Sequence, residues 1–130
     1  MPNPTSQELV QITKHIMRVL DEWGLSGQDI INVLALPKNI RARHLDRFRD
    51  DTPFPADEEI MQRIEHIAGI ADALRTSFPR NAHMGIHWLR TPHKRFKNLA
   101  PLHVVTEQGL TGLRIVRAEL DCAFGWNETS

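Results

Sequence analysis

Histidine is the residue type whose spacing in this chain best suits metal chemistry. His83 and His87 are four residues apart, which places both imidazoles on one face of a helix, and His93 and His103 follow in the sequence. Two histidines at this spacing can chelate a metal ion. No glutamate follows His83 to complete a metalloprotease motif, and no neighbouring carboxylate supplies a third ligand. We therefore predict no metal site and interpret these histidines as surface or half-buried residues.

Nucleophilic catalysis and phosphate binding lack their usual motifs in this chain. Spacing assigns no partner histidine to Cys122, and no serine lies in a nucleophile elbow. The seven glycines are scattered and form no phosphate-binding loop. Glu58 and Glu59 suit the first turn of a helix better than a general acid-base pair. These observations argue against an enzyme.

A basic segment after Pro37 has the composition of a DNA-binding element. A capped helix, a break at Pro37 and the following segment from Lys38 to Arg49 have the order of a helix-turn-helix. The predicted DNA contacts are Lys38, Asn39, Arg41, Arg43 and Arg47. The alternative is a solvated surface helix, which the aspartates of the same stretch favour because they would face phosphates.

The stretch from His87 to Leu102 combines aromatic and basic side chains with two prolines. Exposed tryptophan, phenylalanine and arginine on a proline-stiffened loop are typical of protein interfaces. In the other interpretation, Trp88 and Phe96 fill the core and hold the loop against the last helix, and for Trp88 we favour the core. The side chains expected at the surface are Arg90, Lys94 and Arg95.

Apolar residues recur at helical spacing through the whole chain, and these helices must position the candidates. The predicted helices run from Ser6 to Trp23, Ser26 to Leu36, Lys38 to Arg49, Asp57 to Phe78, Ala82 to Leu89, Pro101 to Gly109 and Thr111 to Phe124. The intervening segments Asp50 to Pro55 and Arg90 to Ala100 are expected to be irregular. The predicted fold class is all-α, in two parts, 1–79 and 80–130, that meet near Pro79.

Length and composition exclude several classes of protein. The 130 residues are 41% hydrophobic and 25% charged, which argues against a disordered chain. Sixteen Lys and Arg balance sixteen Asp and Glu, so any nucleic-acid site must be local. The single cysteine, Cys122, cannot form an intrachain disulfide. Neither a secretory signal nor a membrane-spanning segment is visible, so we expect a cytoplasmic protein without membrane contact.

The C-terminal third has an ordered pattern: a tryptophan, a proline, an aromatic residue, a Pro-Leu pair, a glycine-containing turn and a helix with spaced apolar residues. The positions are Trp88, Pro92, Phe96, Pro101, Leu102, Gly109, Gly112, Val116 and Leu120. This order resembles the toxin-binding domain of the MbcA/ParS/Xre antitoxin family. His93 stands where the family usually has asparagine, and Asn98 where it usually has glycine. Asparagine tolerates a positive φ better than most residues.

The resemblance extends upstream and covers roughly residues 15 to 126. The helix from Ile67 to Leu74, before Phe78-Pro79, looks like the one that precedes the toxin-binding domain. The segment from Trp23 to Pro37 is similar to the family's Xre-type helix-turn-helix core, with Ala35 replacing a common glycine. The resemblance implies an Xre-like helical N-terminal domain over 1–79, followed by a small helical toxin-binding domain over 80–130.

The resemblance also implies a function, namely an antitoxin of a type II toxin-antitoxin pair. Such proteins bind a RES-domain toxin that degrades NAD and obstruct its active-site cleft. Many also repress their own promoter by binding operator DNA. They catalyse nothing and need no cofactor, and a homodimer or a hetero-oligomer with the toxin is expected. The expected toxin contacts are Trp88, Arg90, Pro92, Lys94, Arg95, Phe96, Pro101, Leu102, Arg114, Arg117, Phe124 and Trp126.

The last residues indicate how such an inhibitor would occlude a site. Phe124 and Trp126 flank a glycine, and Glu128 adds negative charge. An aromatic, acidic tail resembles the flat rings and the diphosphate of NAD; the alternative is an unbound, frayed tail. A second class of function also stays open, a helix-turn-helix transcription regulator whose C-terminal half serves dimerisation or effector binding.

Overall fold

The computed structural model describes residues 5–129, with side chains described for residues 5–122. Its elements are α1 (Ser6–Glu22), α2 (Gly27–Leu34), the 3₁₀ turn η1 (Ala42–His44), α3 (Asp46–Asp50), α4 (Glu58–Ser77), α5 (Ala82–Arg90), the 3₁₀ turn η2 (Lys94–Phe96) and α6 (Pro101–Thr129). No β-strand lies within residues 5–129; the one pairing is an isolated bridge between His93 and Leu99. The predicted all-α fold class is confirmed.

Side-chain caps start the helices at the predicted places. The hydroxyl of Ser26 accepts the Asp29 N–H at 3.1 Å at the start of α2. The carboxylate of Asp57 accepts the Glu59 N–H at 2.9 Å at the start of α4. These bonds satisfy amide groups that a helix leaves unpaired in its first turn. At the other end, α2 stops at Leu34, two residues earlier than predicted, because Ala35 adopts a left-handed conformation with φ of 55°.

The prediction of a single helix over Lys38 to Arg49 is wrong. Residues 38–41 lie outside any helix, η1 is a three-residue turn and α3 has five residues. The apolar residues of this segment are Ile40, Leu45 and Phe48, at steps of five and three. Leu45, between η1 and α3, and Phe48 of α3 are buried, whereas Ile40 is half-buried outside both. A full-length recognition helix is therefore not formed.

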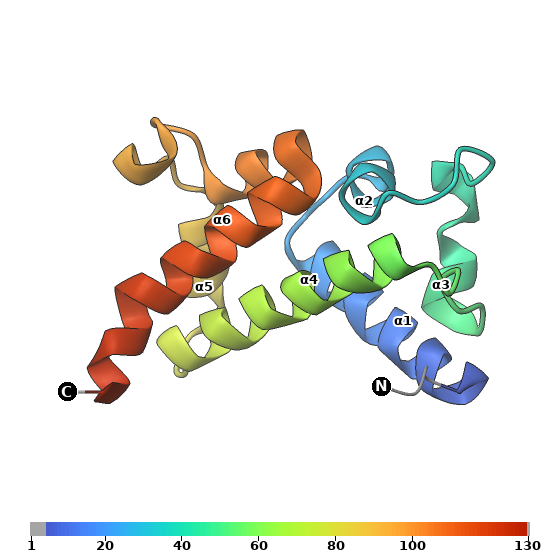
Figure 1. Cartoon of the computed structure of the whole chain (residues 1–130), viewed down its shortest axis with the longest axis horizontal. Coiled ribbons are helices and arrows are strands. Elements are labelled where there is room, and N and C mark those ends of the chain that lie inside the picture. The colour runs from blue at the N-terminus through green and yellow to red at the C-terminus, as the bar shows by residue number, and fades with distance from the viewer. Residues whose placement is uncertain (1–4, 130) are drawn as a thin grey trace.

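One hydrophobic core joins all six α-helices. α4 crosses the centre of the molecule, with α5 and much of α6 above its left half, α2 above its right half and α3 beyond its right end (Figure 1). The buried isoleucines of α4 pack in the same cluster as Val105, Leu113, Val116 and Leu120 of α6. The core thus runs across Pro79, where the boundary between two domains was predicted. No helix in the described part of the chain is long and apolar enough to cross a membrane.

α6 bends at Gly109, where the sequence predicts one helix to end and another to begin. Gly109 has φ of 58° and ψ of −127°, a conformation that side-chain-bearing residues rarely adopt. The bend divides α6 into a first arm, residues 101–108, and a second arm that starts at residue 110. At Gly112, a Cβ atom would come within 2.3 Å of the Val104 carbonyl oxygen, so only glycine permits this close approach of the two arms.

Candidate functional site

An aromatic cluster organises the loop between α5 and α6. The rings of Trp88 and His93 have centroids 5.2 Å apart, and Phe96 meets Trp88 edge-on at 6.2 Å. Phe96 is buried. Trp88 is half-buried and packs against the core, which is between the buried and the exposed position considered for it from the sequence. The His93 Nε2 lies 3.1 Å from the Trp88 carbonyl oxygen, which requires that Nε2 donates a proton. The His93 side chain is therefore held to the end of α5 by a hydrogen bond.

Two consecutive left-handed residues turn the loop back towards α6. Lys97 and Asn98 have φ of 57° and 65°, and the Asn98 N–H donates to the His93 carbonyl at 3.0 Å. Asn98 thus adopts a positive φ, which asparagine tolerates better than most residues. The His93 N–H in turn donates to the Leu99 carbonyl at 3.2 Å and closes the loop. The cations of this loop, Lys94, Arg95 and Lys97, are exposed.

A small cavity of about 340 Å³ opens beside the aromatic cluster. The cluster residues, the loop cations Lys94 and Arg95, and Glu119 of α6 line it. The Arg95 guanidinium pairs with Glu119 at 2.8 Å and ties the loop to the second arm of α6. We call this cavity together with exposed side chains of the loop and of the second arm of α6 the docking surface; its residues are Trp88, Lys94, Arg95, Leu99, Arg114 and Ile115, of which Arg114 lies near His66 of α4.

Two arginines that were expected to contact a toxin make contacts within the chain. The Arg90 Nη2 donates to the Trp23 carbonyl at 3.0 Å, at the end of α1. The Arg117 Nη1 lies 3.2 Å from the His66 Nδ1 and 3.5 Å from the Glu65 carbonyl of α4. Both guanidinium groups lie over a glycine, Arg90 over Gly24 and Arg117 over Gly69, where a Cβ atom would collide with them. These two arginines therefore connect elements that are distant in the sequence.

The other expected toxin contacts are distributed between surface and interior. Pro92, Lys94 and Arg114 are exposed, Leu102 is half-buried and Pro101 is buried. Phe124 and Trp126 lie outside the residues whose side chains the structure describes.

The segment that carries the docking loop has no acidic residue for a long distance. Between Asp72 and Glu107 the chain has six Lys or Arg and four His, but no Asp or Glu. This segment also has two large exposed hydrophobic side chains, Met84 at 47% and Leu99 at 38% exposed. Outside it, Ile115 on the second arm of α6 is 42% exposed. Helical periodicity did not identify Leu99 and Ile115 as surface residues. The gap in acidic residues was the signal available in the sequence.

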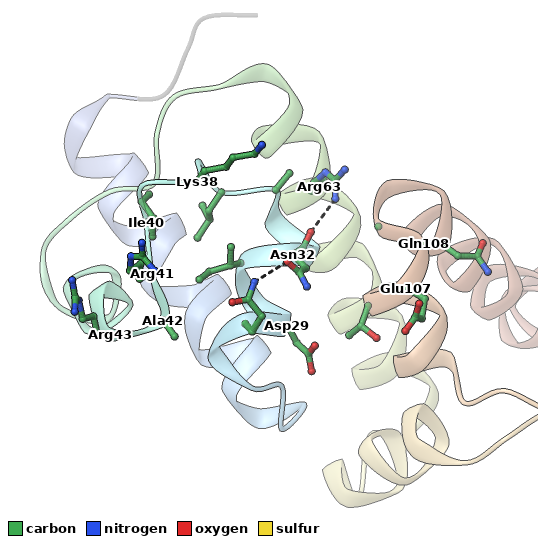
Figure 2. Close-up of a pocket in the computed structure, with 16 residues that line it drawn as sticks. Asp29, Asn32, Lys38, Ile40, Arg41, Ala42, Arg43, Arg63, Glu107 and Gln108 are labelled. Atoms are coloured by element: carbon green, nitrogen blue, oxygen red, sulfur yellow. Dashed lines mark hydrogen bonds between the residues drawn. The ribbon is translucent and has the colours of Figure 1, made fainter.

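The predicted DNA contacts are divided between two hollows. Lys38, Arg41 and Arg43 lie along a cleft of about 1020 Å³ between α2, η1, Arg63 of α4 and the bend of α6 (Figure 2). Asn39 and Arg47 line a separate hollow of about 450 Å³ beside Phe48. The broken segment thus presents its polar side chains in two directions.

His44 lies at the centre of this basic segment. Its Nδ1 accepts the Arg41 N–H at 3.0 Å, which requires that Nδ1 carries no proton. Burial and then the charges of Arg47, Arg43 and Arg41 lower the pKa of His44 below its usual 6.5. Both the hydrogen bond and the surrounding charge thus favour the neutral imidazole.

Among the described residues, no group of three or more His, Cys, Asp or Glu is arranged to hold a metal ion. His83 and His87 are exposed on α5, and the thiol of Cys122 is exposed on α6.

No family model, no curated protein and no solved structure matches this chain.

Proposed function

We propose that this protein is an antitoxin that binds a RES-domain toxin through the docking surface and occludes its NAD site. The observation that supports the proposal most is the combination, on one surface, of an aromatic cavity, exposed hydrophobic side chains and an excess of cations. Soluble proteins rarely expose such groups together unless a partner covers them.

The parts of the docking surface have different roles in this proposal. Trp88 is half-buried and packed against His93 and Phe96, so it offers a rigid aromatic anchor with little side-chain entropy to lose. Lys94 and Arg114 are exposed and have no ion pair among the described residues, so both are available to an acidic partner. Such cations accelerate association and select partners of opposite charge.

Contacts between neighbouring elements hold the docking loop and α6 in place. Arg117 reaches α4 from the second arm of α6, and Arg95 reaches Glu119 from the loop, so loop and helix are held together. Ile115 lies one turn before Glu119 and is carried on the same arm. We assign occlusion of the toxin's NAD site to the segment after Asp121. Its aromatic and acidic residue types resemble the flat rings and the diphosphate of NAD.

The test is binding and inhibition with the product of the reading frame beside this one. We expect the two proteins to co-purify and the toxin's NAD consumption to stop when this chain is added. Lys94→Glu and Arg114→Glu should each weaken binding about tenfold, because a like charge then faces the acidic partner. The matched control is Arg47→Glu, which makes the same change of charge on α3, outside the docking surface.

Failure of the two proteins to associate would refute the proposal. An equal loss of affinity in Arg47→Glu would show that net charge, not the docking surface, governs the interaction. Deletion of residues 123–130 tests occlusion separately: binding should persist while NAD consumption returns.

A DNA-binding regulator is the other function that the sequence leaves open. It has less support, because the expected recognition helix is broken and its polar residues are divided between two hollows.

A further inference from the structure

The cleft of about 1020 Å³ lies away from the docking surface and has two chemically different walls. One wall is the loop after α2 together with η1, which carries Lys38, Arg41 and Arg43. Across from it lie Asp29 of α2 and Glu107 at the end of the first arm of α6 (Figure 2). We propose that this cleft binds a small phosphorylated molecule that also carries hydroxyl groups, namely a nucleotide or a sugar phosphate.

The cationic wall is available for a phosphate group. Lys38, Arg41 and Arg43 are exposed and make no ion pair with any described acidic residue. Arg49, in the same basic segment, differs, because Asp21 and Asp46 hold it at 2.7 Å and 2.8 Å. Unpaired cations from one wall of a cleft are the donors that phosphate oxygens require.

The opposite wall is suited to hydroxyl groups. Among the described residues, no ion pair or hydrogen bond engages the carboxylate of Asp29, and Glu107 has only a 4.0 Å contact with His103. Carboxylates accept hydrogen bonds from ribose hydroxyls in nucleotide-binding folds. A ligand with an anionic end and a hydroxyl-bearing part therefore matches both walls at once. Inorganic phosphate matches only the cationic wall.

The size and shape of the cleft favour a small molecule over a nucleic-acid strand. Its volume of about 1020 Å³ is that of a small-molecule site. The first arm of α6 closes one side with Thr106, Glu107 and Gln108, so a continuous phosphate backbone would have to pass these groups and would be repelled by Glu107.

Arg63 of α4 lines the cleft and also contacts the bend of α6. The Arg63 Nη1 donates to the Val33 carbonyl at 3.1 Å, and its Nη2 pairs with Glu59 at 3.0 Å. The same guanidinium lies against Gly109, and its Nε is buried without a hydrogen-bond partner. A ligand that spans both walls would therefore hold the first arm of α6 against α2. This role goes beyond the proposed function and does not depend on it.

The test is a titration of the full chain, without any partner protein, with ADP, ribose 5-phosphate and inorganic phosphate. Calorimetry gives the affinity, and the backbone amide signals of Asn32 and Gly109 report the place of binding. We expect the two sugar phosphates to bind more tightly than inorganic phosphate. Lys38→Glu and Arg43→Glu should each weaken ADP binding about tenfold or more, since each removes a charge-assisted hydrogen bond. Glu107→Gln should weaken ADP binding without weakening inorganic phosphate binding, because the carboxylate accepts hydrogen bonds from hydroxyl groups and repels phosphate.

Arg47→Glu is again the matched control, because Arg47 belongs to the same basic segment but lies outside the cleft. It should change ADP affinity less than twofold, roughly the scale of a single exposed charge. The proposal is overturned if none of the three compounds binds at millimolar concentration, or if Arg47→Glu weakens binding as much as Lys38→Glu. It is also overturned if a DNA duplex displaces ADP and its binding requires Arg47, which would assign the basic segment to nucleic acid.

Discussion

Thr13 has a hydroxyl group that connects α1 to the loop before α4. Its side chain is fully buried, at 0% exposed, and is the polar residue buried in the described core. The hydroxyl donates to the Leu9 carbonyl at 2.7 Å and accepts the Phe54 N–H at 2.9 Å. The Phe54 ring packs against Phe48 with centroids 5.0 Å apart. One hydroxyl thus fixes the loop that joins the basic segment to α4.

Replacing this residue by valine, Thr13→Val, keeps the shape of the side chain and removes the hydroxyl. The buried Phe54 N–H then has no acceptor, a loss that typically costs about 1–3 kcal/mol of the free energy of unfolding. Unfolding entropy scales with chain length, so for a chain of this size each 1 kcal/mol lowers Tm by about 4 °C. We therefore expect Tm to fall by about 4–12 °C.

The assay is urea denaturation together with hydrogen exchange of the Phe54 amide. Thr13→Ser is the matched control, because it retains the hydroxyl and loses a methyl group. Thr13→Ser should lose some stability but keep the Phe54 amide protected, whereas Thr13→Val should lose this protection. If Thr13→Val is as stable as the natural chain, or if serine exposes the Phe54 amide equally, the hydroxyl does not hold the loop.

Two further predictions follow from the bend of α6 and from the basic segment. Gly109→Ala should lower the free energy of unfolding by about 1–3 kcal/mol in urea denaturation, because its φ is 58° and the new Cβ would meet Arg63 at 2.9 Å. The control is Gly85→Ala inside α5, where the new Cβ would lie at an ordinary 3.4 Å from Leu74 of α4. The free energy of unfolding of this variant should stay equal or rise by up to about 1 kcal/mol. Equal losses in both variants would contradict the role of the positive φ at Gly109. The pKa of His44 is lowered in the folded chain from 6.5, so the unfolded chain takes up this proton first and stability falls as the pH drops through 6.5. His44→Gln should reduce this pH dependence in denaturation measured between about pH 7.5 and about pH 5, and an unchanged dependence would show that His44 does not contribute to it.

The sequence alone determined the features that depend on neighbouring residues. Ser26 and Asp57 start their helices because a side-chain oxygen caps amides two or three residues away. Gly109 bends α6, and Asn98 takes a positive φ, because backbone sterics are set residue by residue. The all-α class follows in the same way from apolar spacing.

Only the tertiary structure decided where the long side chains go and how the basic segment folds. Arg90 reaches Trp23 and Arg117 reaches His66 across the fold, and such contacts leave no periodic signal in the chain. The segment from Lys38 to Arg49 is broken into η1 and α3 although it is rich in helix formers, and the residues of the broken segment line two hollows. Local propensity is worth tenths of a kcal/mol per residue, whereas burial of a large side chain is worth about 1.5–3 kcal/mol, so packing determines the outcome.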